Sequence, residues 1–223
     1  MSRVYLYALL SGAPSCETGM GVCAERLRVV AVGGLMALVG DVAESPPPTA
    51  VILRAQDAVL RRLASAVEAL LPVRFGTLVD DDGALAESLA ARRPQLARAL
   101  GRVAGCEQMT LRVWGESVPA APAADLGGGP GTRYLAERRH AQAWAHRVPE
   151  LDPIRGQLEA LVREERAERH DRPPLLATVQ HLIPRGAGGR YVEVIDAARA
   201  ELRPWRVSVT GPWPPYAFTE DAA

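Results

Sequence analysis

The chain has 223 residues, and its 26 Lys+Arg balance 26 Asp+Glu, so its formal net charge at pH 7 is zero. Such a chain lacks the overall positive field with which nucleic-acid binders and binders of anionic membranes hold their partners. Hydrophobic residues make up 48% and charged residues 23%, as in an ordinary soluble globular protein. Every basic residue is an arginine, which excludes mechanisms that require lysine, including P-loop phosphate binding and Schiff-base catalysis.

Cysteines and apolar runs indicate the compartment. The three cysteines, Cys16, Cys23 and Cys106, do not have a common zinc-binding spacing, and we interpret them as reduced thiols. The longest apolar run, at 29–40, is shorter than a membrane span of roughly 17–25 residues. The apolar stretch at 4–10 is short for a signal peptide and favours a first β-strand. We therefore expect a cytoplasmic protein that does not bind membranes.

The first half of the chain alternates strand and helix patterns. Two apolar runs flank Gly33-Gly34, a typical hairpin signal. Pro94 should break or kink the second helix. The pattern predicts two helices packed on a mostly antiparallel sheet, a modified ferredoxin-like α+β sandwich with an added strand. The predicted elements are a strand at 3–10, hairpin strands at 26–32 and 35–42, a helix at 49–71, a strand at 73–79, a helix at 84–103 and a strand at 107–114.

The richest run of Pro and Gly divides the chain into two predicted domains. Residues 116–132 form the linker, between an N-terminal domain at 1–115 and a helix-rich α+β domain at 133–223 that ends in the GPWPPY tail. The charged run at 163–172 is expected to lie in solvent. The other elements predicted for the second domain are helices at 133–147, 152–162 and 191–202 and strands at 175–183 and 205–209.

No group of residues has the spacing of a catalytic or metal site. His140 and His146 point to different sides of a helix, and His181 is interpreted as a core histidine hydrogen-bonded to its neighbours. The acidic run 80–82 lacks the EF-hand spacing and is read as a turn with a helix cap. The glycine cluster at 127–131 lacks the P-loop continuation. We expect a protein that is not an enzyme and has no catalytic, cofactor-binding or metal-binding residues.

Two segments remain unexplained by these patterns. In the first, LPVRFGT at 71–77, we expect Arg74 to be largely buried and paired, and Phe75 to lie in the core. The second, TGPWPPYAF at 210–218, combines three prolines with three aromatic rings. Because its prolines leave it little conformational entropy to lose, we expect it to fold back onto the protein rather than to recruit an SH3-like partner.

Together these two segments resemble the GvpF/GvpL family of gas vesicle proteins. The resemblance covers about residues 3–218, including the VYLYAL strand and the LRVWG strand. Gln56-Asp57 departs from the pattern, because a His-containing pair is expected near the middle of the long helix. The residues that carry the resemblance, with an expected structural or partner-binding role, are Pro72, Arg74, Phe75, Gly76, Gly211, Pro212, Trp213, Pro214, Pro215, Tyr216 and Phe218.

The resemblance implies a non-enzymatic, minor gas vesicle protein. It implies that the chain binds the hydrophobic shell protein GvpA and other gas vesicle accessory proteins, and that it assists nucleation or assembly of the vesicle wall. The implied location is the gas vesicle, with the cytoplasm before assembly. The alternative is an RNA-binding module on a ferredoxin-like sheet, against which stand the missing RNP aromatic pattern and the zero net charge.

Overall fold

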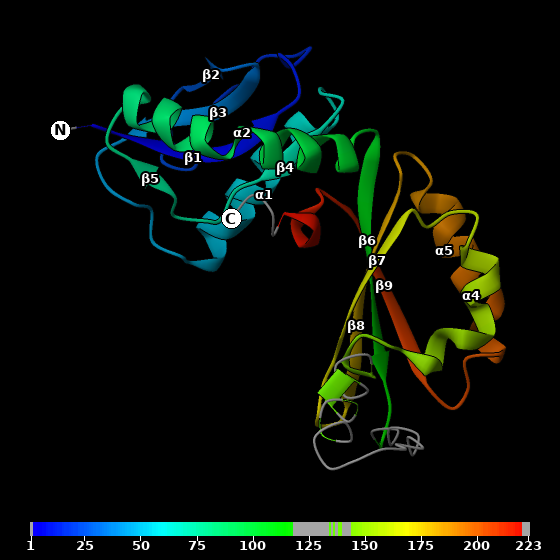
Figure 1. Ribbon diagram of the computed structural model, residues 1–223. Helices are drawn as coiled ribbons and strands as arrows, with labels where there is room; N and C mark the ends of the chain where they lie inside the picture. The colour runs from blue at the N-terminus through cyan, green and yellow to red at the C-terminus, as the bar shows by residue number, and fades with distance from the viewer. Residues whose placement is uncertain (1, 118–133, 135, 137, 140–143, 220–223) are drawn as a thin grey trace. The chain divides into compact units, whose positions relative to one another are not determined.

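The computed structural model describes residues 2–117, 134, 136, 138–139 and 144–219 (Figure 1). The fold is α+β, as predicted, and the chain divides into two compact units. The first unit combines the residues up to Glu107 with those from Trp213 onward, and the second is Gln108–Pro212. The aromatic tail, expected in the second domain, thus packs within the first unit. The sequence pattern identified the segment but not the unit against which it packs.

The first unit contains a sheet of order β2-β3-β1-β4, with β5 also paired to β1. The hairpin prediction is confirmed: β2 and β3 are antiparallel and joined by Gly33 and Gly34, whose φ values of 54° and 88° favour glycine. Every residue of β1 after Arg3 is buried, so both faces of the central strand are covered. The elements are β1 (Arg3–Leu10), β2 (Leu27–Val32), β3 (Leu35–Val42), α1 (Ala50–Ala64), β4 (Leu70–Pro72), β5 (Leu78–Val79) and α2 (Asp82–Val103).

Helix α1 covers the face of the sheet that carries Tyr5 and Tyr7. Its buried Leu60 and Leu63 belong to the same apolar cluster as the two tyrosines. Thr49 caps the helix by accepting a hydrogen bond from the Ile52 amide. The prediction that this helix continues to Leu71 was wrong, because α1 ends at Ala64 and the chain re-enters the sheet as β4.

The predicted strand at 73–79 is also corrected. β4 ends at Pro72, paired with Ala8 of β1, and pairing resumes only at β5. Proline has no amide hydrogen with which to continue the ladder. Between β4 and β5 the backbone of Val73 and Thr77 still hydrogen-bonds β1, and the chain turns away from the sheet at residues 74–76.

Helix α2 runs through Pro94 without ending there. Proline removes the hydrogen bond to the carbonyl of Ala90, but buried leucines on both sides, Leu89 and Leu96, hold the helix against the protein. Asp81 caps its start by accepting from the Ala84 amide at 2.8 Å. The acidic run 80–82 thus forms a turn and a helix cap, as predicted. The cap residue is Asp81, whereas the sequence pattern favoured Asp82 or Gly83.

The second unit contains a sheet of order β7-β8-β6-β9. The strand at 107–114 was expected to complete the first sheet, but β6 belongs to this one, because alternation predicts a strand without identifying its partners. The charged run 163–172, expected in solvent, contains the half-buried strand β7. The elements are β6 (Cys106–Trp114), α4 (Asp152–Leu158), β7 (Glu164–Arg169), β8 (Leu175–Pro184), α5 (Gly188–Ala197) and β9 (Arg206–Trp213), with short 3-10 helices at Pro149–Leu151 and Ala198–Ala200.

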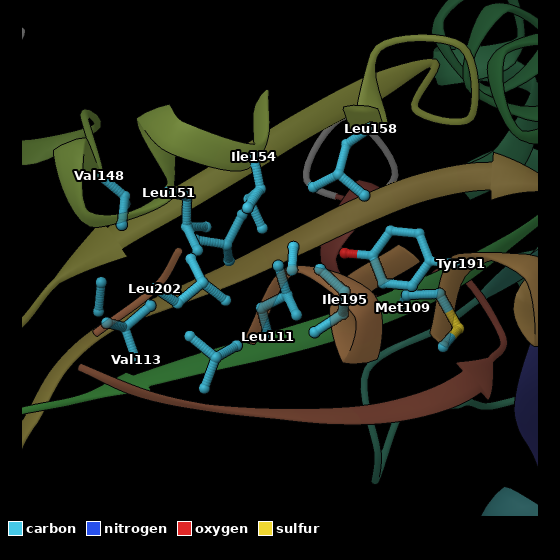
Figure 2. Close-up of a cluster of buried hydrophobic side chains, with 14 of the residues drawn as sticks. Met109, Leu111, Val113, Val148, Leu151, Ile154, Leu158, Tyr191, Ile195 and Leu202 are labelled. Atoms are coloured by element: carbon cyan, nitrogen blue, oxygen red, sulfur yellow. The ribbon is translucent and has the colours of Figure 1, made fainter. Parts of the chain in front are cut away.

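The core of the second unit lies between its sheet and the helices α4 and α5. Figure 2 shows Leu111 and Val113 of β6 turned toward Leu151 and Ile154, with Ile195 of α5 beside them, and all five are buried. All but the first two residues of the linker predicted at 116–132, and seven residues of the helix predicted at 133–147, lie outside the described residues. Among the helices that the structure describes, none has the length and apolar character required to cross a membrane.

Candidate functional site

A pocket of about 550 Å³ lies in the first unit, at the place where the two sequence motifs meet. One wall comes from α1, another from the residues at the end of β4 and after it, and a third from the C-terminal tail. Because it is open to solvent and long enough to contact three segments, we call it the α1–tail groove. Its lining residues are Leu53, Gln56, Asp57, Pro72, Val73, Arg74, Phe75, Trp213, Tyr216 and Thr219.

The LPVRFGT motif forms the turn that brings Arg74 and Phe75 to this groove. The Val73 amide still donates to the Tyr7 carbonyl at 3.0 Å, after which the chain departs from β1. Thr77 closes the turn, its hydroxyl donating to the Arg74 carbonyl at 2.7 Å. Gly76 has a φ of +85°, a conformation that strongly favours glycine. Its amide donates to the Tyr5 hydroxyl, which fixes the turn to the sheet.

The expectation that Arg74 is buried and paired was wrong, because its side chain is exposed. It stands on a turn rather than within a strand, so no layer of the protein covers it. Phe75 is half-buried rather than a core residue, and its ring packs edge-to-face on Tyr5 with a centroid distance of 6.2 Å. The motif therefore presents a cation and part of an aromatic ring at the protein surface.

The tail folds back onto the protein, as predicted, and the structure shows that it packs on α1. The Arg61 guanidinium stacks 3.9 Å from the Trp213 ring centroid and donates to Asp57 at 2.7 Å. The Tyr216 hydroxyl donates to the other Asp57 oxygen at 2.8 Å. Burial, and then this bond to a carboxylate, raise the pKa of Tyr216 well above its ordinary value. Its hydroxyl therefore stays protonated at neutral pH and serves as a hydrogen-bond donor rather than a base.

Phe218 anchors the end of the tail. Its side chain is fully buried, and its carbonyl accepts a hydrogen bond from Arg102 of α2 at 2.9 Å. The short 3-10 helix Tyr216–Phe218 turns these two rings to different surroundings: Phe218 into the protein and Tyr216, 38% exposed, toward the groove.

The structure brings five of the eleven motif residues together, and the other six do not line the groove. Pro72, Arg74, Phe75, Trp213 and Tyr216 line the groove. Of the others, Gly76 shapes the turn, and Gly211 has a φ of +133° within β9. Pro214, Pro215 and Phe218 are buried, whereas Pro212 is exposed. Their roles in partner binding remain predictions.

The sequence reasoning missed the α1 wall of this groove. Leu53, 44% exposed, and Asp57 lie one turn apart on that helix. The i,i+4 spacing of Asp57 and Arg61 is typical of an ion pair on a helix and could be recognised in the sequence. The contact of Asp57 with Tyr216, 159 positions away in the chain, could not. Gln56, noted as a departure from the family pattern, also lines the groove and accepts the Tyr5 hydroxyl.

The groove has the features of a binding site. Its walls are mainly apolar, and Asp57, the carboxylate among its described lining residues, is already bound by Arg61 and Tyr216. Within the described residues there is no cluster of three or more His, Cys, Asp or Glu side chains that could hold a metal ion. Exposed apolar walls with a few fixed polar groups are typical of sites that receive another apolar surface.

A second pocket, of about 450 Å³, lies in the second unit beside α4 and contains His181. His181 is buried as predicted, between the Tyr191 hydroxyl at 2.6 Å and Glu165 at 2.9 Å. Arg155 in turn donates to both oxygens of Glu165. Each polar group of this chain of contacts has a partner, so we interpret it as a structural network.

This network predicts a pH-dependent stability. The hydrogen bond from His181 is the main cause that holds the pKa of Glu165 below its ordinary value, with a smaller contribution from Arg155. A carboxyl group with a lowered folded-state pKa stabilises the fold above its unfolded pKa of about 4.3, and this contribution is lost as the pH falls through the folded pKa. The loss of unfolding free energy caused by Glu165→Gln should therefore be largest at pH 7 and should shrink progressively below about pH 4.

Urea titrations of the wild type and Glu165→Gln from pH 3 to pH 7 measure this difference. Glu159→Gln is the matched control, because Glu159 lines the same pocket but is exposed. A difference between wild type and Glu165→Gln that stays constant across the range would contradict the prediction.

Comparisons with known proteins find gas vesicle proteins of similar sequence and fold. Gas vesicle protein L of a Streptomyces species is 27% identical over 91% of this chain and 86% of its own length. Gas vesicle protein L2 of Halobacterium salinarum is 26% identical over 97% of this chain and 91% of its own. The crystal structure of GvpF from Microcystis aeruginosa matches the fold with a TM-score of 0.75 at 14% identity, covering 99% of this chain and 100% of that one.

The family model described as gas vesicle synthesis protein GvpL/GvpF matches residues 3–220, nearly the whole chain. That span contains both motifs and every residue that lines the α1–tail groove. The chain belongs to the GvpL/GvpF family of gas vesicle synthesis proteins.

Proposed function

We propose that this protein binds the gas vesicle shell protein GvpA and assists nucleation or assembly of the vesicle wall, with the α1–tail groove as the docking site. The observation that carries the proposal is the meeting of the two family motifs at one groove with exposed apolar walls. A buried motif needs no function beyond stability, whereas Arg74 of the first motif and Tyr216 of the second have exposed side chains.

The physical reasoning concerns the state of the shell protein before the wall forms. A small hydrophobic subunit exposes apolar surface until it joins its neighbours, and such surface promotes aggregation. A partner that covers part of that surface delays aggregation, and it releases the subunit if the interface is modest in area. The groove fits this role because it combines apolar walls with polar groups at its edge.

We also propose that the protein acts at the gas vesicle, together with other accessory proteins, and without a cofactor or metal. The groove owes its shape to the packing of α1, the turn after β4 and the tail. Binding of the shell protein should therefore be unchanged in chelator-treated buffer.

Introducing a charge on the α1 wall should weaken docking without unfolding the protein. Leu53→Glu places a carboxylate among the apolar groups of the groove, and we expect it to weaken binding of the shell protein about tenfold or more. Val51→Glu is the matched control, because Val51 lies on the same helix, is 71% exposed and does not line the groove. Co-purification of the shell protein with each variant, in chelator-treated buffer, is the measurement.

Equal binding by both variants would contradict the groove as the docking site. Loss of binding by the wild type on chelation would contradict the cofactor-free mechanism. No binding by the folded wild-type protein in either buffer would contradict the proposed function itself.

The RNA-binding alternative gains no support from the sheet of the first unit. RNA-binding sheets of this type stack bases on aromatic rings that stand on an open face. Here Tyr5 and Tyr7 are fully buried beneath α1. An RNA strand could not reach them without displacing that helix.

A further inference from the structure

Arg74 is a charged lining residue of the α1–tail groove with no charge partner among the described residues. The described part of the lining contains two charged residues, Asp57 and Arg74. Asp57 is engaged through both oxygens, by Arg61 and by Tyr216. The guanidinium of Arg74 is exposed and, within the part of the chain that the structure describes, forms no hydrogen bond or ion pair. The backbone carbonyl of Arg74 accepts hydrogen bonds from the amide and the hydroxyl of Thr77.

We propose that the groove recognises an amphipathic segment of the partner that places an Asp or Glu carboxylate against Arg74. The apolar side chains of that segment would lie on Leu53, Phe75 and Trp213. This inference rests on the proposed function and adds the chemistry by which the partner is selected. It makes Arg74 a specificity-determining residue.

The chemistry of arginine favours a carboxylate in this position. A guanidinium offers a planar set of donors that matches the two oxygens of a carboxylate. Beside apolar walls the pair is screened less than on an open surface, so its attraction is stronger. A segment that carries a basic residue at this point would be repelled, because Asp57 has no free oxygen with which to compensate.

The turn holds Arg74 in a defined place, so the contact can also set the register of the bound segment. The positive φ of Gly76 and the bond from Thr77 to the Arg74 carbonyl fix the backbone on which the side chain stands. Charge pairs at the edge of an apolar interface contribute to orientation more than to affinity. The apolar walls then supply most of the binding energy.

The test uses the full-length protein and two sets of overlapping synthetic peptides that span the shell protein. In the second set each Asp and Glu is replaced by Asn or Gln. We expect Arg74→Gln to weaken binding of one acidic peptide about three- to tenfold, and Arg74→Glu to weaken it further. The wild-type protein should bind the amide version of that peptide more weakly than the acidic version, by a similar factor. Arg74→Gln should bind the two versions with equal affinity, because the charge pair is already lost.

Arg54→Gln is the matched control, because Arg54 is an exposed arginine of α1 that does not line the groove. Undiminished peptide binding by Arg74→Gln, together with loss of binding by Leu53→Glu, would overturn this inference and leave the proposed function standing. Failure of the wild type to bind any peptide or the intact shell protein would overturn both.

The acidic residues Glu220 and Asp221 follow the tail in the sequence and provide a further discrimination. The effect of Arg74→Gln should persist when it is combined with Glu220→Gln and Asp221→Asn. If the effect disappears in that background, Arg74 acts through the protein's own carboxylates, and the inference is wrong.

Discussion

Replacement of Phe218 by alanine is expected to lower the free energy of unfolding by about 3–5 kcal/mol. The ring is fully buried in the first unit, and it holds the tail whose Trp213 and Tyr216 form one wall of the groove. The substitution loses the favourable free energy of burying the ring, and it leaves a cavity that the surrounding structure fills only in part. The loss should appear in urea titrations and as faster amide hydrogen exchange in α1 and β4.

Tyr216→Phe is the matched control for this prediction. It removes the hydrogen bond to Asp57 from an exposed ring and should cost only about 0.5–1.5 kcal/mol. Phe218→Leu keeps an apolar side chain in the core and provides a folded variant if the alanine variant proves too unstable to purify. A loss below about 1 kcal/mol for Phe218→Ala would mean that the tail is not anchored by this ring.

The sequence predicted the hairpin of the first sheet well because its signals are local. Residues 27–32 and 35–42 form a hairpin because two glycines can adopt positive φ between two apolar runs. The limits of the following helix were predicted less well. Val67 and Leu70 continue a helical spacing, but both are buried by the fold after the helix has ended at Ala64. Apolar periodicity alone does not distinguish such residues from a further helical turn.

The candidate site was predictable in its parts and not in its assembly. Both motifs were singled out, yet the burial of Arg74 was predicted from its sequence neighbours, and the strand assumed there is a turn. The contact between Asp57 and Tyr216 joins residues 159 positions apart. Such contacts depend on how the tail packs, and this is decided by the tertiary fold rather than by local preference.

The charged run at 163–172 shows the same limit for electrostatics. A segment rich in Arg and Glu normally stands in solvent, and this expectation failed for Arg169, whose side chain is 6% exposed. Arg169 can be buried because Glu150, from a distant 3-10 helix, meets it with two hydrogen bonds of 3.0 Å. The ring of Trp144 lies 5.0 Å from the same guanidinium.

This buried pair carries the second large prediction. Glu150→Ala should lower the free energy of unfolding by about 3–5 kcal/mol, because it leaves the Arg169 guanidinium buried without its counter-charge. The carboxylate of Glu150 is fully buried, so water cannot replace it without opening the unit. Urea titration measures the loss, and the faster hydrogen exchange should appear in β7 and β8 rather than in α1 and β4.

Two further variants separate this effect from the loss of any ion pair. Asp196→Asn breaks a pair with Arg199 whose side chains are 51% and 60% exposed, and it should cost less than about 1 kcal/mol. The double variant Glu150→Leu with Arg169→Met removes both charges and should recover most of the stability that Glu150→Ala loses. If the double variant is as unstable as Glu150→Ala, the loss comes from packing around Glu150. The buried charge is then not its cause, because no charge remains in that variant to be left unpaired.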